Sequence, residues 1–236
     1  MKLGIISDIH ANLPALRVCL KKLDDEKVDK IICLGDLVGY GPFPNECCDL
    51  IRERGISTVL GNHDGAITGD VPLKAFLEPN HSLLKWTSEV ITPENKAFLN
   101  SLDLTLTDEK WLAVHASPIQ PKRWTYLDSA MACREILKKT DYDIIFVGHT
   151  HKPAIIAEKF GVFAVKPGHR YVINPGSIGQ SRDDDLRASL GILDTDKTHY
   201  NNLRLDYPVQ ETLDHYTAIG FTESQGKNLL GLNGNI

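Results

Sequence analysis

Five short apolar runs in this sequence each end in residues that could bind a metal ion or carry a proton. The runs end in the segments Asp8-Ile9-His10, Gly35-Asp36, Gly61-Asn62-His63-Asp64, His115 and Gly148-His149-Thr150-His151. A single histidine after a strand is more often an ordinary hydrogen-bonded side chain than a ligand, but repeated endings of one kind favour a shared site. The carboxyl ends of strands in an α/β sheet lie along one edge, where ligands bind. We therefore expect these side chains to meet at that edge.

The residue types at these strand ends narrow the choice of metal. They are imidazoles, carboxylates and one amide oxygen, without a thiolate, which suits Mn, Fe, Zn, Co or Ni. The candidate ligands are Asp8, His10, Asp36, Asn62, His115, His149 and His151. These groups are too many for one tetrahedral ion but are enough for two ions if one carboxylate bridges them. Two-metal sites clamp the attacking and leaving oxygens of a phosphoryl displacement, and His63 would then be free to donate a proton.

Alternating strand and helix patterns position these residues in the first 150 residues. Continuous apolar runs of the kind buried on both faces predict strands at Lys2–Ile6, Lys30–Leu34, Ile56–Leu60, Trp111–Val114 and Asp143–Val147. Helical spacing and capping residues predict helices from Asn12 to Lys27, from Asn45 to Arg54, from Thr92 onward and from Ser129 to Lys139. This alternation is typical of an α/β protein.

The pattern changes after Gly148. Strand-length pieces separated by Gly or Asp turns lie at Pro153–Glu158, Gly161–Val165, Arg170–Asn174, Ala188–Asp194 and His199–Asp206. They fit antiparallel hairpins better than βαβ units. From Pro208 a helical tail, about residues 207–236, leads to an end that we expect to be frayed. We predict one domain over residues 1–236, with two sheets packed face to face and helices outside.

Composition limits the class of protein. The chain has 236 residues, of which 42% are hydrophobic and 24% charged, as in soluble globular proteins. Its formal net charge is −5, which disfavours a nucleic-acid partner. No apolar run is long enough for a membrane span or a signal peptide, so no membrane partner is expected. The five cysteines form no CxxC pair, and we predict reduced, mostly buried thiols in a cytoplasmic protein.

As a set and in their order, the strand-end motifs resemble those of the calcineurin-like metallophosphoesterases. The resemblance covers about residues 1–180, and Asn174-Pro175-Gly176-Ser177 is similar to a late loop of the small bacterial and archaeal branch. It implies a four-layer αββα sandwich and two divalent ions per chain, with Mn as the first choice. It also implies that Asp8, His10, Asp36 and His151 hold the first ion, that Asp36 bridges, that Asn62, His115 and His149 complete the second, and that His63 is the general acid.

The chain departs from one motif of this family. In two branches of the family, the protein serine/threonine phosphatases and the symmetrical dinucleoside-tetraphosphate hydrolases, the Gly-Asp motif extends to Gly-Asp-x-Val-Asp-Arg-Gly. In this sequence Gly39 replaces the second Asp of that motif and Tyr40 replaces the Arg. Gly39 removes the carboxylate that would orient the catalytic histidine, and Asp64 could take over that task. Tyr40 removes an Arg that would suit a dianionic monoester. The absence of this arginine therefore favours a phosphodiester, or a small monoester held mainly by the metals.

The resulting hypothesis is a phosphoesterase in which a metal-bound hydroxide attacks phosphorus and His63 protonates the leaving oxygen. A phosphodiesterase is favoured, and a phosphomonoesterase acting on proteins or nucleotides is the alternative on the same site. A non-catalytic scaffold, like the retromer subunit with this fold, is disfavoured because every ligand position and His63 are present. A DNA-processing nuclease is disfavoured by the acidic charge.

Other conspicuous residues receive less specific interpretations, and no substrate-binding residue is assigned. Aromatic residues that could line a pocket mouth, but that fit simple packing at least as well, are Tyr40, Phe43, Trp124 and Tyr126. Arg123 and Arg182 could meet phosphate, although solvated surface is favoured for each. His81, His169, His199 and His215 are interpreted as ordinary surface residues, and Asp183-Asp184-Asp185 as a solvated turn.

Overall fold

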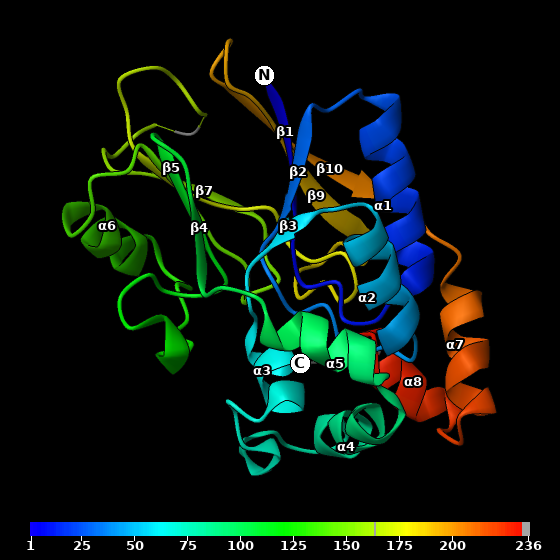
Figure 1. The fold of residues 1–236 in the computed structure, drawn as a ribbon. Helices are drawn as coiled ribbons and strands as arrows, with labels where there is room; N and C mark the ends of the chain where they lie inside the picture. Colours follow the sequence, from blue (N-terminus) through cyan, green and yellow to red (C-terminus); the bar gives the residue numbers. More distant parts are fainter. Residues whose placement is uncertain (163, 233–236) are drawn as a thin grey trace.

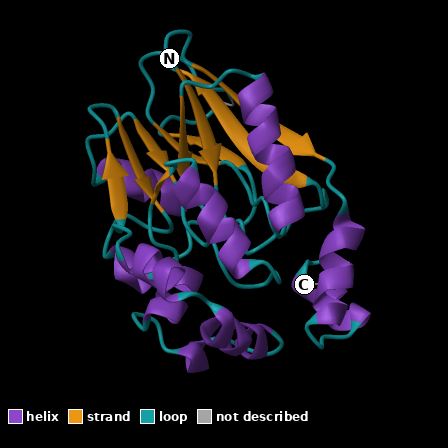
Figure 2. Cartoon of the chain, turned by 45° about the vertical axis from the view of Figure 1, so that its right-hand side comes forward, coloured by secondary structure: helices purple, strands orange, loops and turns teal. Residues whose placement is uncertain are grey.

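The computed structural model describes residues 1–162 and 164–232. Two five-stranded sheets lie face to face, and helices cover their outer faces (Figures 1 and 2). The arrangement is a mixed α/β sandwich of the αββα kind, as the sequence predicts. Because both inner sheet faces are covered, the inner strands consist mainly of apolar residues.

The first sheet has the strand order β10-β9-β1-β2-β3. Its strands are β1 (Lys2–Ile6), β2 (Lys30–Cys33), β3 (Ser57–Thr58), β9 (Ala188–Asp194) and β10 (His199–Leu205). The pairs β1–β2 and β2–β3 are parallel, whereas β9 runs antiparallel to β1 and to β10. The strands β1 and β2 therefore end at the same edge.

The second sheet has the order β4-β5-β6-β8-β7. Its strands are β4 (Thr105–Thr107), β5 (Trp111–Val114), β6 (Ile144–Phe146), β7 (Ala154–Ala157) and β8 (Tyr171–Asn174). The central strands β5, β6 and β8 are parallel, and β4 and β7 run antiparallel at the two edges. Parallel β5 and β6 therefore deliver their following loops to one edge as well.

Helices connect the strands and cover the sheets. They are α1 (Leu13–Asp25), α2 (Pro44–Glu53), α3 (Asn62–Thr68), α4 (Asn80–Val90), α5 (Pro93–Asn100), α6 (Ala130–Lys138), α7 (Val209–Ala218) and α8 (Glu223–Leu229), with 3₁₀ turns η1 (Leu73–Ala75) and η2 (Pro121–Arg123). The side chain of Asn12 accepts a hydrogen bond from the Ala15 N–H and so caps α1. The buried stripe Leu16, Leu20 and Leu23 of α1 packs against the first sheet.

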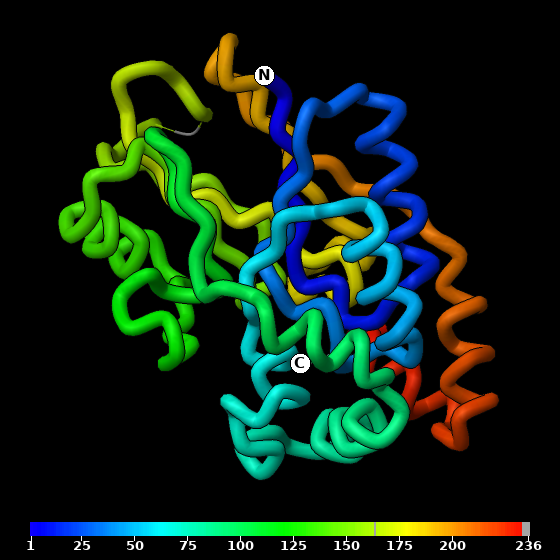
Figure 3. The backbone as a smooth tube through the Cα atoms, in the orientation of Figure 1, coloured from blue at the N-terminus to red at the C-terminus, as the bar shows by residue number. Residues whose placement is uncertain are grey.

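The helical tail returns to the body of the molecule. Figure 3 shows the segment after β10 running back along α1, and α7 contacts both α1 and α8. The Thr212 hydroxyl donates to the Asn12 side chain (3.1 Å), and the Gln180 side chain donates to the Leu229 carbonyl oxygen (2.7 Å). The tail thus contacts the cap of α1 and the loop that follows β8.

The core confirms the predicted layers and thiols. Leu3, Ile5 and Ile32 of the first sheet meet Phe146 and Ile173 of the second in one buried cluster. All five cysteines are buried and free. No helix of residues 1–162 and 164–232 is long and apolar enough to cross a membrane. The prediction of a single domain over residues 1–236 stays a prediction.

Several predicted elements need correction. The strand predicted at Gly161–Val165 is wrong for its described residues, which form turns and bends, and Gly161 has a left-handed φ of 77° that interrupts extended backbone. Strand β8 pairs antiparallel with β7 as expected but also parallel with β6, so this part is more than a hairpin. The helices α3 and α4 have no counterpart among the predicted elements.

Candidate metal centre

The strand ends bring the predicted ligands together at one edge between the two sheets. Asp8 follows β1, Asp36 follows β2, His115 follows β5, and His149 and His151 follow β6. All five side chains are buried. Left-handed backbone is uncommon for residues other than glycine, yet it occurs at Asp8, His10, Asp36, His149 and His151. Such conformations collect at functional sites, where the surrounding structure holds them in place.

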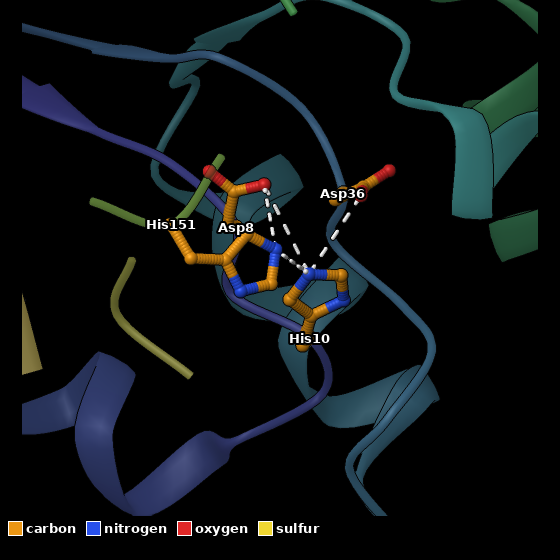
Figure 4. Close-up of side chains that lie close together, drawn as sticks. All are labelled: Asp8, His10, Asp36 and His151. Atoms are coloured by element: carbon orange, nitrogen blue, oxygen red, sulfur yellow. Dashed lines mark hydrogen bonds and ion pairs between the residues drawn. The ribbon is translucent and has the colours of Figure 1, made fainter. Parts of the chain in front are cut away.

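Four of the predicted ligands form a first cluster, which is drawn in Figure 4. The His151 Nε2 lies 3.4 Å from Asp8 Oδ1, and His10 Nε2 lies 3.7 Å from Asp36 Oδ2. The two imidazole Nε2 atoms of His10 and His151 are 3.0 Å apart. One ligand atom from each residue lies within 4.8 Å of the others, so one ion could contact all four.

A second cluster shares Asp36 with the first. The His115 Nε2 lies 3.3 Å from Asp36 Oδ2, 3.1 Å from His149 Nδ1 and 3.1 Å from Asn62 Oδ1. Asn62 is the first residue of α3 and is half-buried. We call the seven side chains of the two clusters the pocket floor: Asp8, His10, Asp36, Asn62, His115, His149 and His151.

The hydrogen bonds of the floor histidines fit a bound cation. The Nδ1 atoms of His10, His115 and His151 lie 3.1, 2.7 and 2.6 Å from backbone carbonyl oxygens. A carbonyl oxygen only accepts, so each Nδ1 carries a proton, and each Nε2 faces the cluster as the nitrogen that can offer its lone pair to a cation. Two lone pairs 3.0 Å apart repel unless a cation or a proton lies between them. Such carbonyl contacts commonly orient metal-binding histidines.

The electrostatics of the floor agree with this donor set. Burial alone would raise the pKa of Asp36, but His115 and His63 beside it hold that pKa well below its usual value. Burial opposes the charged form of His115, yet the Asp36 and Asp8 carboxylates raise its pKa to about 9. The floor thus keeps its carboxylates ionised and attracts positive charge. Both properties favour divalent cations.

His63 lies beside the floor, where aromatic side chains surround its ring. Its ring centroid is 4.7 to 4.9 Å from those of His10, Tyr40 and Phe76. Its Nδ1 is buried without a hydrogen-bond partner in the described structure, and a Cβ on residue 39 would lie 2.1 Å from that atom. Glycine at position 39 therefore makes room for the ring.

Asp64 does not orient His63, contrary to the expectation from the sequence. Its Oδ1 accepts hydrogen bonds from the Leu37 N–H (2.9 Å) and the Val38 N–H (3.2 Å), and its Oδ2 accepts from the Gly61 N–H (3.1 Å). These amides belong to the two loops that carry Asp36 and Asn62. Asp64 therefore fixes the ligand loops, and the His63 ring is held by packing.

A cavity of about 270 Å³ opens over the floor and His63. We call five of its other side chains the pocket wall: Tyr40, Phe76, Trp124, Tyr126 and Arg182. Tyr126 stacks on His149 with ring centroids 3.9 Å apart, and Trp124 approaches His115 edge-on at 5.9 Å. A larger cavity of about 530 Å³ between Trp111 and Leu193 is lined by none of the predicted ligands.

The wall changes several expectations from the sequence. Arg182 is half-buried in the wall, so solvated surface is the wrong interpretation for it, whereas Arg123 is exposed as expected. Phe43 packs against His215 and does not line the cavity. Asp183 forms a half-buried ion pair with Arg204, so it is more than a solvated turn residue. Phe76 was not singled out, and no local pattern in the sequence marks it.

Comparison with known proteins places these features in a family. The chain is 35% identical over 238 residues to an uncharacterized protein of Methanocaldococcus jannaschii, MJ0912, with 96% of each chain covered. It is 36% identical to a metallophosphoesterase of Sphaerobacter thermophilus, whose crystal structure matches with a TM-score of 0.83 over 97% of this chain and 98% of that one.

A more distant relative carries a named activity. The phosphodiesterase MJ0936 of Methanocaldococcus jannaschii is 25% identical over 206 residues, which cover 87% of this chain and all of that protein. The sequence profile of the calcineurin-like phosphoesterase superfamily domain matches residues 1–198, a stretch that contains every residue of the floor and wall. The chain belongs to the calcineurin-like phosphoesterase superfamily.

Proposed function

We propose that this protein is a dinuclear metal-dependent hydrolase of phosphate esters, and more specifically a phosphodiesterase. Membership of a family of metal-dependent phosphoesterases supports a hydrolase. The observation that carries the dinuclear part is the pair of buried ligand clusters that share Asp36. A single carboxylate between two groups of inward-facing imidazoles fits two neighbouring cations.

The proposed ligand assignment follows the two clusters. Asp8, His10, Asp36 and His151 would hold one ion, and Asp36, Asn62, His115 and His149 would hold the other. Manganese is the first choice, with Fe, Zn, Co or Ni as alternatives for the same donor set. When bound, such ions supply Lewis acidity toward the phosphoryl oxygens and the attacking water.

We assign the proton transfer to His63. Its backbone N–H donates to Asp36 Oδ1 (2.8 Å), so the residue is anchored to the carboxylate shared by both clusters. Its ring lines the cavity together with residues of the floor. Burial lowers the pKa of His63 to about 4, and the charges that favour its imidazolium form are the Asp36 carboxylate and the anion of an entering phosphate ester. The ring could then donate a proton to the leaving oxygen.

The choice of a diester has two supports. The relative MJ0936 is named a phosphodiesterase, and this chain matches it over its whole length. Tyr40 stands where the phosphatase motif has an arginine. A phosphomonoester is the second candidate, and the observation in its favour is the presence of Arg182 in the pocket wall, because guanidinium groups suit dianionic phosphates.

Hydrolysis of two matched substrates tests the proposal. Protein reconstituted with Mn²⁺, and separately with the other metals, is assayed on bis-p-nitrophenyl phosphate and on p-nitrophenyl phosphate. We expect the larger kcat/KM on the diester. A larger kcat/KM on the monoester would replace the diester assignment by the second candidate. If neither substrate is hydrolysed with any of the metals, the proposal that this protein is a phosphoesterase is wrong.

A further inference from the structure

Arg182 is built into the loop that also orients a floor histidine. The Gln180 carbonyl oxygen accepts the hydrogen bond from His151 Nδ1, and the Gln180 side chain accepts one from Arg182 Nε (3.2 Å). Gln180 is itself held by its side-chain bond to the Leu229 carbonyl oxygen on the tail. The Arg182 side chain is therefore fixed at its Nε with respect to the floor.

The far end of Arg182 contacts Tyr40, another residue of the pocket wall. Its Nη2 donates to the Tyr40 hydroxyl (2.9 Å), and its guanidinium carbon lies 5.6 Å from the Tyr40 ring centroid. The two residues are 142 positions apart in the sequence. They line the same cavity as Asp36, His63 and His151. The guanidinium thus lies beside the place where the phosphoryl group of a substrate would meet the floor.

This cation has no counter-ion among the residues that the structure describes. Its hydrogen-bond partners are the neutral Gln180 amide and the Tyr40 hydroxyl. The acids that follow it in the chain are paired elsewhere, Asp183 with Arg204 and Asp185 with Arg187. The floor carboxylate of Asp8 raises the pKa of Arg182 but forms no ion pair with it. Burial opposes the charged form of the guanidinium, but the neighbouring Tyr40 and Asp8 hold its pKa above the usual value, so the group stays charged and can give an anion in the cavity a charge-assisted hydrogen bond.

We propose that Arg182 binds a non-bridging phosphoryl oxygen of the substrate, with Tyr40 as the positioning residue that holds its guanidinium over the pocket. The proposal rests on the proposed function for the identity of the anion. The fixed Nε and Nη2 leave N–H groups of the planar fork for an oxygen acceptor. Tyr40 therefore supports an arginine from a distant loop in place of one in its own position.

Phosphate binding tests Arg182 apart from turnover. Inorganic phosphate is titrated calorimetrically into the metal-loaded wild type and Arg182→Gln, and both are assayed on bis-p-nitrophenyl phosphate. Charge-assisted hydrogen bonds of this kind predict that Arg182→Gln weakens phosphate binding and lowers kcat/KM by about 10- to 100-fold. Arg187→Gln is the matched control, because Arg187 is on the same segment but is exposed and paired with Asp185. It should leave both quantities unchanged.

The outcomes separate this proposal from the proposed function. Phosphate binding by Arg182→Gln that equals binding by Arg187→Gln would overturn the role of Arg182, even if the wild type is an active phosphodiesterase. If Arg182→Gln loses phosphate binding but the wild type hydrolyses no ester, the phosphate site is supported and the proposed enzymatic function is wrong.

Two further variants exclude a purely structural role. If Arg182→Gln also loses metal by elemental analysis, Arg182→Lys is the deciding variant, because it keeps the charge but loses the planar fork that makes two separate hydrogen bonds. Phosphate binding by Arg182→Lys above that of Arg182→Gln supports the proposal, and equal binding overturns it. Tyr40→Phe keeps the ring and removes the acceptor of the Nη2 bond. Tyr40→Phe should raise KM a few-fold with little change in kcat. In the double variant with Arg182→Gln, Tyr40→Phe should have no further effect on KM.

Discussion

The floor and the wall of the pocket are built by different means. Every floor residue stands at or just after the end of a strand or at the start of α3, and six of the seven are at most 6% exposed. No wall residue is buried, and Tyr126 is 48% exposed. The wall residues come from separate loops and turns. The floor is therefore fixed by the sheets, whereas the wall depends on how distant loops meet.

This difference assigns different tasks to the two regions. Buried carboxylates and oriented imidazoles give the floor one geometry and a strong preference for cations, which is what chemistry common to a whole family requires. Under the proposed function, the wall would surround the part of a substrate that differs from one ester to another. Substitutions in the floor should thus abolish turnover of every substrate, whereas substitutions in the wall should change the ranking of substrates.

The largest effect is expected at Asp36. Asp36→Asn removes the negative charge that both clusters share, so it should lower the metal content of both sites together. Loss of metal-based catalysis, worth several kcal/mol, predicts a fall in kcat/KM of about 10³-fold or more. Elemental analysis after reconstitution with Mn²⁺ should give two ions for the wild type and fewer than one for the variant.

Asp70→Asn is the control for this experiment. Asp70 is an exposed carboxylate that pairs with Lys122 and belongs to neither cluster. It should keep both ions and full activity. A ceiling of one ion per chain in the wild type at saturation would contradict the shared role of Asp36.

The next effect concerns His63, which lies where floor and wall meet. His63→Asn should keep both ions and lower kcat/KM by about 10²- to 10⁴-fold on a diester with an alkyl leaving group, since a poor leaving group needs the proton. The loss should be much smaller with p-nitrophenolate, which leaves without protonation. Measuring both substrates and the metal content of the variant checks this.

His149→Asn provides the contrast. It removes an inward-facing nitrogen of the second cluster, so it should lower metal content and reduce activity on both leaving groups alike. If His63→Asn behaves in the same way, the assignment of His63 as the proton donor is wrong and it acts as a ligand or phosphate contact.

Local sequence signals were sufficient to predict the floor. Apolar runs followed by Asp8, Asp36 and His115 indicate both the strands and the side chains at their ends, because strand formation and ligand position depend on adjacent residues. The same reasoning fails for Arg182 and Tyr40, which meet across 142 positions. No periodicity or motif encodes such a contact, and only the path of the loops brings it about.

The fold shows the same limit. In the first 150 residues the apolar runs correctly predict β1, β2, β5 and β6, whereas the half-buried edge strand β4 has no counterpart among the predicted strands. The strand length of the Gly161–Val165 segment and the turn residues around it predict a strand, but extended backbone also needs a neighbouring strand to pair with. The helix α4 has no clear signal in the sequence. It follows Pro72 and Pro79, which are typical of loops, and its buried leucines Leu83 and Leu84 are too few to form an apolar stripe.

A smaller effect is expected in the stability of the metal-free protein. Burial lowers the pKa of His63 to about 4, whereas an imidazole in the unfolded chain has a pKa near 6.5. Between these values the unfolded state binds more protons, so the free energy of unfolding falls as the pH falls below about 6.5. Over the interval from pH 7.5 to 5.0 the share of His63 is about 2 kcal/mol, because the slope reaches 1.36 kcal/mol per pH unit only well below pH 6.5.

Urea unfolding with a chelator at pH 7.5 and at pH 5.0 measures this loss. His63→Asn should lose about 2 kcal/mol less than the wild type over that interval, because asparagine does not titrate. An equal loss in both proteins would mean that the His63 ring is open to protons in the folded state and is not held by its packing against His10, Tyr40 and Phe76.

The smallest effect is expected in the wall, at Tyr126. Its exposed ring stacks on His149 and lines the cavity, so it could also stack on an aromatic group of a substrate. Aromatic contacts of this kind are worth about 0.5–1.5 kcal/mol, which predicts that Tyr126→Ala raises KM for bis-p-nitrophenyl phosphate about 3- to 10-fold. Methyl p-nitrophenyl phosphate lacks the second ring and should be affected less, and Tyr126→Phe, which keeps the stack, should resemble the wild type. Equal losses on both substrates, together with a lower metal content, would show that Tyr126 supports the His149 imidazole, and would move this residue from the substrate-selecting wall to the support of the floor.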